Sequence, residues 1–174
     1  KRNWVGTWSA CDDGCFFPAV PIRFLSEYYT MKNDQKIKLF LVDDDAVFLK
    51  LLEIEYLRNT GFIIETYPTG ELCIENLHHK PDVIVLDYHL NGMDNTAMDG
   101  MKTLDNIKAR HPDIPVVILS AQDDIDVALN CMHHKAFDYL VKNKSAFVHL
   151  HNAITTIFNY NKMEEKWHQL PLAV

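Results

Sequence analysis

The sequence predicts an α/β protein in which a parallel sheet is covered by helices on both faces, and two observations support this fold class. Several short runs are apolar at consecutive positions, which is typical of strands buried on both faces rather than of half-exposed strands. Each run is followed by a stretch whose apolar residues have helical spacing. Strands and helices that alternate with short connections form a doubly wound sheet, because their crossovers are right-handed.

Five strands and five helices are expected in strict alternation. The predicted strands are Ile37–Val42, Phe62–Tyr67, Val83–Asp87, Ile114–Leu119 and Phe137–Val141. The predicted helices are approximately Ala46–Asn59, Thr69–Leu77, Met101–Arg110, Asp123 or Asp124 to His133, and Ser145–Tyr160.

Local signals set several helix boundaries. Gly61 ends the first helix, because glycine readily adopts the backbone conformation that closes a helix. Thr69 can cap the second helix, and Glu71 lies on its first turn, where the helix dipole favours negative charge. The last helix has an apolar inner face, formed by Phe147, Leu150, Ile154, Ile157 and Phe158.

The composition bounds the class of protein. The 174 residues suffice for one domain with a buried core, and the 48% hydrophobic and 24% charged residues are ordinary globular values. A net charge of −7, a pI near 5.6 and the lack of a Lys/Arg cluster argue against a nucleic-acid surface. No apolar run approaches the ~20 residues that a membrane span needs.

The cysteines and the N-terminal stretch predict a cytoplasmic location. The four cysteines show no paired CxxC spacing, and they are Cys11, Cys15, Cys73 and Cys131. A zinc site or a disulfide stays open, but free thiols in a reducing compartment are the favoured interpretation. Prolines and early acids interrupt the first thirty residues, unlike a signal peptide.

The chain divides into three parts by composition. Residues 1–35 contain aromatic residues without a clear period, and Met31 looks like a natural domain start, so we expect an N-terminal appendage of unknown role there. One domain is expected over residues 36–160. Residues 161–174 would form a C-terminal tail that is too short for an output domain. On this interpretation the domain stands alone, unless the chain is a fragment that has lost an output domain.

Chemically reactive side chains follow four of the predicted strands. Asp43 and Asp44 follow the first strand, Asp87 ends the third, Ser120 follows the fourth and Lys142 the fifth. In a flavodoxin-like strand order, 2-1-3-4-5, the carboxyl ends of these strands meet at one edge of the sheet.

Three carboxylates so close together repel each other unless a cation neutralises them, and oxygen ligands suit Mg²⁺. The lysine and the serine hydroxyl can stabilise a phosphoryl group. The edge therefore has the parts needed for phosphoryl transfer onto a carboxylate. Each residue alone has an ordinary explanation, since an acidic run is usually a helix cap and Asp87 could cap a turn. Four such residues at four strand ends are harder to dismiss.

In these features the sequence resembles the receiver domains of two-component response regulators, over about residues 36–160. The matching segments are Leu41–Asp45, Val83–Asp87, Met98–Gly100, Val116–Ala121 and Asp138–Lys142. Their order and separation are those of the family. The resemblance implies a domain that serves in phosphorelay signal transduction and is not itself an enzyme.

The resemblance implies a role for each site residue. Asp87 would accept a phosphoryl group from a phosphohistidine of a sensor histidine kinase or a histidine phosphotransfer protein. Asp44 would hold Mg²⁺ directly and Asp43 through water, with Asp87 and the backbone carbonyl of His89 completing the ligands. Ser120 would be the switch hydroxyl, Tyr139 the aromatic residue that turns inward, and Lys142 the cation that pairs with the phosphoryl group.

The family also implies a surface that changes on phosphorylation. It lies around the fourth predicted helix, which ends near His133, and the fifth strand, and it would bind a downstream protein or support a phosphorylation-dependent dimer. Two side chains could set the lifetime of the phosphoryl group, because His89 and Gln122 lie two positions after Asp87 and Ser120.

The sequence departs from the family pattern at three places. Asn143 follows the lysine where proline, often after a cis peptide bond, is usual. Leu90-Asn91 replaces the usual Met-Pro, and the loop behind it is longer. Lys135 occupies a position where glycine is common. No reactive residue is lost, so we expect a working receiver.

Two other functions compete with this one. A receiver-like interaction module with an inactive site would share the fold, and Mg²⁺ binding would distinguish the two. A haloacid-dehalogenase-type phosphatase also uses an aspartate nucleophile, but that chemistry needs a second acid two residues later, where this chain has His89.

Overall fold

The computed structural model describes residues 36–57, 61–90 and 97–169, with side chains described as far as residue 161. The sheet has five parallel strands in the order β2-β1-β3-β4-β5, which confirms the predicted fold class and strand order. The strands are β1 (Ile37–Val42), β2 (Phe62–Tyr67), β3 (Val83–Asp87), β4 (Val116–Ser120) and β5 (Asp138–Val141). The expected appendage over 1–35 lies outside the described residues and stays a prediction.

The described residues form five α-helices and one short 3₁₀-helix, and all of them except α6, which follows β5, lie between two strands. They are α2 (Ala46–Leu57), α3 (Gly70–Glu75), the 3₁₀-helix η1 (Leu77–His79), α4 (Gly100–Arg110), α5 (Ile125–His133) and α6 (Ala146–Gln169). The predicted Thr69 cap is confirmed, and Asp124, one of the two residues predicted to start the fourth helix, is the N-cap of α5. Thr69 Oγ1 accepts from the Leu72 amide, and Asp124 Oδ1 accepts from the Asp126 amide.

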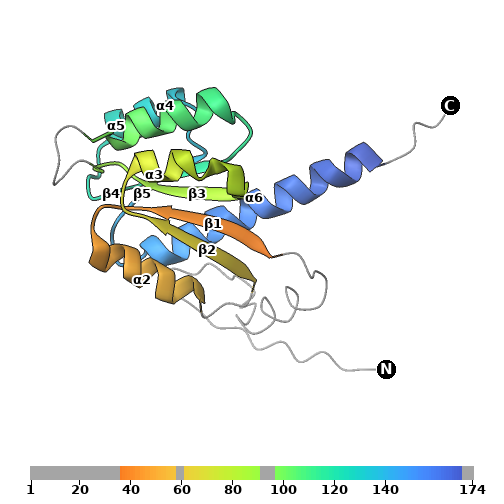
Figure 1. Cartoon of the computed structure of the whole chain (residues 1–174), viewed down its shortest axis with the longest axis horizontal. Coiled ribbons are helices and arrows are strands. Elements are labelled where there is room, and N and C mark those ends of the chain that lie inside the picture. Colours follow the sequence, from red (N-terminus) through yellow and green to blue (C-terminus); the bar gives the residue numbers. More distant parts are fainter. Residues whose placement is uncertain (1–35, 58–60, 91–96, 170–174) are drawn as a thin grey trace, which may run out of the picture. The chain divides into compact units, whose positions relative to one another are not determined.

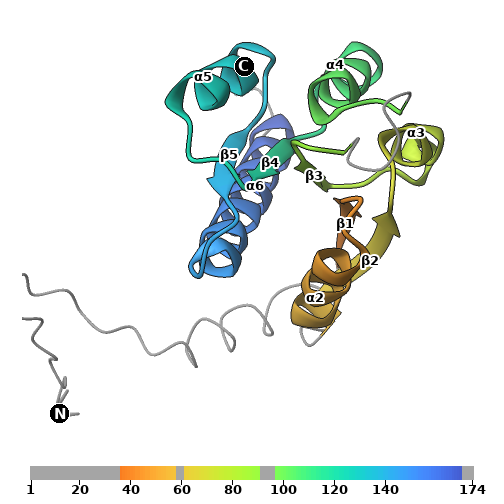
Figure 2. The same ribbon diagram turned by 90° about the vertical axis from the view of Figure 1, so that its left-hand side faces the viewer.

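The helices cover both faces of the sheet (Figures 1 and 2). Helices α3, α4 and α5 pack on one face, where Phe40, Leu86 and Ile118 point. Helices α2 and α6 pack on the other face, where Leu39 and Leu119 point. Alternate residues of a strand point to opposite faces, so consecutive apolar residues are needed to fill both layers. This explains why the strands lack an alternating pattern.

The last helix is longer than predicted. We expected it to end near Tyr160, but α6 continues to Gln169, so most of the expected tail is helical. The added stretch contains Lys, Glu, Met and Gln, which favour helices, and no glycine or proline before Pro171. A proline disfavours helical backbone at the residue before it, so a stop shortly before Pro171 follows from the sequence.

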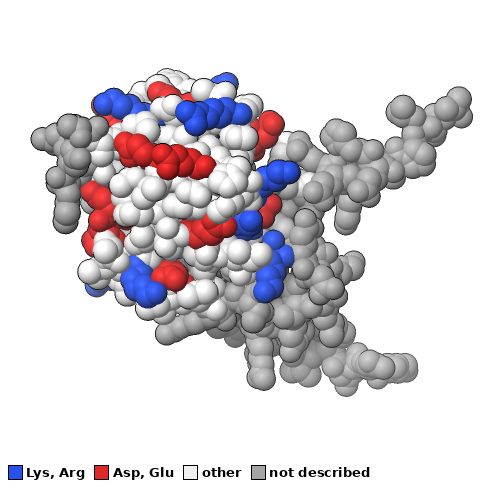
Figure 3. Space-filling model, viewed as in Figure 1, with Lys and Arg blue, Asp and Glu red and all other residues white. Residues whose placement is uncertain are grey.

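The described helices and surface bear on two of the excluded classes. Among the residues that the structure describes, no helix has both the length and the apolar composition for crossing a membrane. On the face shown in Figure 3, the Lys and Arg side chains of this part form separate small groups between Asp and Glu.

Candidate functional site

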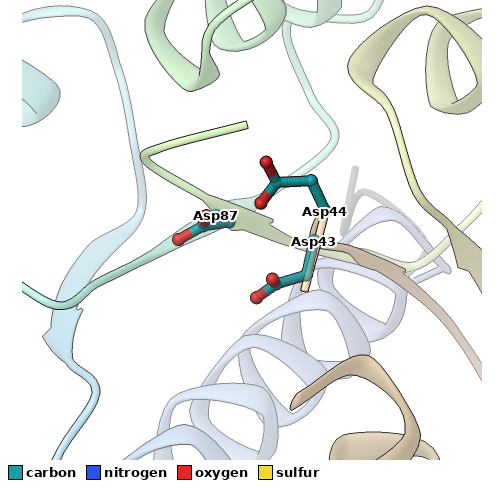
Figure 4. Close-up of side chains that lie close together, drawn as sticks. All are labelled: Asp43, Asp44 and Asp87. Atoms are coloured by element: carbon teal, nitrogen blue, oxygen red, sulfur yellow. The ribbon is translucent and has the colours of Figure 1, made fainter. Parts of the chain in front are cut away.

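Three carboxylates meet at the carboxyl edge of the sheet. Asp43 directly follows β1 and Asp87 is the last residue of β3, and these two strands are neighbours with Val42 opposite Leu86. A carboxylate oxygen from each of Asp43, Asp44 and Asp87 lies within 4.8 Å of the others. Figure 4 shows the three side chains directed to the same side of the strand ends. The structure thus brings together the three acids that the sequence selected.

The three consecutive acids Asp43–Asp45 serve two different purposes, since some lie in the acid cluster and one caps the helix that follows. Asp45 Oδ1 accepts from the amides of Val47 and Phe48, so Asp45 caps α2. The Asp45 amide in turn donates to Asp43 Oδ1 at 2.9 Å. The helix-cap explanation therefore holds for Asp45, whereas Asp43 and Asp44 face the acid cluster.

Lys142 neutralises part of this cluster. Its Nζ lies 2.7 Å from Asp43 Oδ2 and 2.8 Å from Asp87 Oδ1, and its side chain is largely buried. Burial alone would lower the pKa of Lys142, but the hydrogen bonds to Asp43 and Asp87 outweigh it and raise the pKa above its ordinary value. Lys142 is therefore a charged ammonium that bridges two strand ends.

Asp43 is the most deeply buried acid of the cluster, only 1% exposed. Its pKa is raised to about 6, chiefly because burial disfavours the charged form and secondly because Asp87 is close, although the hydrogen bond from Lys142 opposes both. Three carboxylates against one ammonium leave an excess of negative charge at this edge.

A second set of contacts links β4 to β5. The Gln122 amide donates to Ser120 Oγ at 3.1 Å, and the Tyr139 hydroxyl donates to the Gln122 carbonyl at 2.7 Å. Ser120 is fully buried and Tyr139 is half-buried. Burial raises the pKa of Tyr139, which stays a neutral donor at neutral pH. Sequence reasoning assigned only the side chain of Gln122 a role, but its backbone joins the serine to the tyrosine.

Comparison with known proteins identifies the family. The family model "Response regulator receiver domain" matches residues 39–155, about two thirds of the chain. The chain belongs to the response regulator receiver family. Receivers are signalling domains of two-component systems, and the matched family is not a classical enzyme family.

The similar curated proteins are much longer. The chain is 38% identical over 105 residues to the "DNA-binding transcriptional regulator NtrC" of Escherichia coli K12, which is 60% of this chain and 21% of that protein. It is 36% identical over 100 residues to the "Luminescence regulatory protein LuxO" of Vibrio campbellii, 57% of this chain and again 21% of that protein. The match thus spans about a fifth of the length of these relatives.

Solved receiver structures resemble the chain over most of its length. The signal receiver domain of a LuxO repressor protein from Vibrio parahaemolyticus superimposes with a TM-score of 0.67 at 25% identity, covering 78% of this chain and 99% of that one. A receiver domain from Clostridium thermocellum gives a TM-score of 0.63 at 26% identity, covering 73% of this chain and 98% of that one.

The receiver holds its lysine without the usual proline. The described residues contain no cis peptide bond, so the bond before Asn143 is trans, and Lys142 still reaches both acids. The Lys142 amide donates to the Ser120 carbonyl at 2.7 Å. Asn143 Oδ1 accepts from the Ser145 amide at 2.8 Å, and the Asn143 carbonyl accepts from the Ala146 amide. Asn143 thereby organises the start of α6 through its side chain.

The far end of the extended loop is fixed close to Asp87. Residues 91–96 lie outside the described part, but the Met98 amide donates to Glu71 Oε1 at 2.6 Å, and Asp99 caps α4 by accepting from the Lys102 amide. The Gly100 amide donates to the Tyr88 carbonyl. A β-carbon at Gly100 would collide with the backbone of Asp87 and Tyr88, which explains a glycine here.

Two expectations are only partly addressed by this geometry. His89 is exposed, and its ring lies 4.8 Å from that of Tyr88, centroid to centroid. The role of its backbone carbonyl as a metal ligand stays a prediction.

One residue that sequence reasoning missed is Phe48, whose ring centroid lies 4.5 Å from Lys142 Nζ. An aromatic residue on the first turn after the acidic run was the available signal.

Proposed function

We propose that Asp87 of this receiver accepts a phosphoryl group from the phosphohistidine of a sensor histidine kinase or a histidine phosphotransfer protein. In this step an Asp87 carboxylate oxygen bonds to phosphorus, the phosphorus–nitrogen bond of the donor breaks, and the histidine leaves with the bonding electron pair and takes up a proton. The main support is the contact of Lys142 with both Asp43 and Asp87, because its ammonium lies 2.8 Å from a carboxylate oxygen of Asp87 and could offset the charge of an incoming phosphoryl group.

The acid cluster fits a divalent cation. Its donors are carboxylate oxygens, which Mg²⁺ prefers, and they are close enough together to bind one ion. Asp43, Asp44 and Asp87, with the backbone carbonyl of His89, would hold it. The bound ion would supply positive charge toward the oxygens of the incoming phosphoryl group.

The residues of the chain then have distinct tasks. Lys142 offsets the charge of the phosphoryl group, because its ammonium already lies between the two acids. The Ser120 hydroxyl donates to a phosphoryl oxygen. Its oxygen then shifts relative to the Gln122 amide, which donates a hydrogen bond to it in this structure. Because the Tyr139 hydroxyl donates a hydrogen bond to the carbonyl of the same Gln122, a shift of Ser120 can be transmitted to Tyr139 through the backbone of Gln122.

The surface that responds is the outer side of α5 together with β5. Helix α5 exposes Ile125, Leu129 and Met132, which lie one turn apart along one side. We propose that a downstream protein, or a second receiver in a phosphorylation-dependent dimer, binds this surface. The full-length activities of NtrC and LuxO belong to those longer proteins.

A small phosphodonor with Mg²⁺ tests the proposal directly. The wild-type chain should gain a phosphoryl adduct that is labile to both acid and base, and Asp87→Ala should gain none. Asp82→Ala, which removes an exposed acid at the opposite end of β3, is the matched control and should be modified like the wild type. A wild-type chain that gains no such adduct contradicts the proposal.

A Mg²⁺ titration separates a working receiver from an inactive interaction module. Wild-type protein should show saturable amide shifts at Asp43 and Asp44 in NMR spectra, and Asp44→Ala should lose them. An unchanged spectrum would favour the inactive module, which shares the fold but not the chemistry.

A further inference from the structure

The ammonium of Lys142 has a third neighbour besides its two acids. Its Nζ lies 4.5 Å from the centroid of the Phe48 ring, well within the ~6 Å over which a cation is attracted to an aromatic face. The contact is partly shielded from solvent, because the Lys142 side chain is only 17% exposed and Phe48 is half-buried. Such shielding strengthens the attraction relative to an exposed pair.

The Phe48 ring is itself held from two sides. Its backbone amide is fixed by the Asp45 cap at the start of α2. Its ring stacks against Phe147 on the first turn of α6, with centroids 6.4 Å apart and planes inclined by 29°. Phe48 therefore joins the turn that carries Asp43 and Asp44 to the loop that carries Lys142. Both rings also pack against the core layer between the sheet and helices α2 and α6.

An aromatic face and a carboxylate hold a lysine in different ways. Each carboxylate oxygen takes up one of the three N–H donors of the ammonium, whereas the ring attracts the charge as a whole. An ammonium resting on a ring can therefore redirect its donors to new oxygens without losing that attraction.

We propose that Phe48 is a positioning residue that holds the Lys142 ammonium at the acid cluster while its donors exchange from carboxylate to phosphoryl oxygens. The inference rests on the proposed phosphoryl transfer to Asp87. Phe48 touches no reacting atom and acts only through Lys142.

The first experiment reads the contact without any phosphorylation. A ring face shifts nearby protons upfield, so the ε-methylene protons of Lys142 should resonate upfield of the other lysines. Phe48→Leu should abolish this shift, Phe48→Tyr should keep it, and Phe62→Leu should leave it unchanged, because the Phe62 ring pairs with Tyr56 at the opposite end of the sheet. A wild-type Lys142 without the shift, or a shift that survives in Phe48→Leu, overturns the inference.

The second experiment measures phosphorylation by a small phosphodonor at saturating Mg²⁺. Phe48→Leu should slow the maximal rate by about three- to tenfold, as expected for a cation–π contact intermediate between exposed and fully desolvated, and Phe48→Tyr should restore it. Equal slowing in both variants indicates a packing role and overturns the inference. If the wild type accepts no phosphoryl group, the proposed function fails, whereas the proton shifts still test the Phe48–Lys142 contact.

Discussion

The centre of the sheet and its β5 edge are built differently. Every residue of β3 and β4 is buried, and their side chains fill both core layers. Every residue of β5 is only half-buried. The neighbouring helix α5 buries only Cys131 among its own residues and exposes several large apolar side chains.

This difference in burial agrees with different roles for the central strands and the β5 edge. Asp43 directly follows β1, and Asp87 and Ser120 end β3 and β4, so close packing fixes their positions, as the proposed phosphoryl transfer would require. The β5 edge carries Tyr139 and borders α5, where looser packing allows a shift at low cost in free energy. On the proposed function a receiver needs a fixed site and a responsive surface, and the burial of β3, β4 and β5 agrees with such an arrangement on adjacent strands.

The same substitution in the two regions should give the largest contrast. Leu39→Ala empties a fully buried position in β1 and should lower the free energy of unfolding by about 2–5 kcal/mol. Leu129→Ala on the exposed side of α5 should change it by less than about 0.5 kcal/mol. Urea unfolding measures both. Similar losses would mean that the α5 surface is packed against something in solution.

The burial of Asp43 makes the centre sensitive to pH. Its pKa rises from 3.8 to about 6 on folding, so between these values the folded state holds a proton that the unfolded state has released. The free energy of unfolding should therefore fall as the pH rises from about 4 to 6, on the order of 2–3 kcal/mol in the absence of Mg²⁺. Asp43→Asn should flatten this dependence, and Asp123→Asn at an exposed position should not. Urea unfolding of the wild type and both variants between about pH 4 and pH 7 measures this dependence, and a slope that persists in Asp43→Asn would contradict the prediction.

The backbone strain at Lys135, just before β5, can be removed by substitution. This residue has a φ of 66°, a left-handed conformation one residue after the His134 C-cap of α5, and the Lys135 and Ala136 amides donate to the Met132 and Cys131 carbonyls. Lys135→Gly should stabilise the protein by about 1 kcal/mol, because glycine adopts this conformation without strain. Lys135→Ala, which keeps the strain, should give little gain in thermal unfolding. A destabilised Lys135→Gly would contradict the strain argument.

The smallest expected effect concerns the lifetime of the phosphoryl group. Gln122→Ala removes an exposed side chain but keeps the backbone contacts to Ser120 and Tyr139. We predict that it slows loss of phosphate by about two- to fivefold, because the side chain no longer orients an attacking water. Decay of the adduct at fixed Mg²⁺ measures this. An unchanged rate would leave Gln122 with its backbone role alone.

Much of the fold and of the candidate site could be predicted from the sequence. Consecutive apolar runs such as Val83–Leu86 require burial on both faces, which dictates a parallel sheet covered on both sides. Because parallel strands all end at one edge, the acids and the lysine that follow them had to converge there.

The tertiary structure decided what depends on contacts between distant segments. It set the trans path through Asn143, the backbone bridge through Gln122 and the Phe48 ring beside Lys142. The extension of helix α6 past its expected end is different, because it follows from the helix propensity of its own residues and not from contacts between distant segments. Patterns along a chain specify which elements form and which ends meet, but the direction of one side chain at the meeting point is fixed only by its neighbours in space.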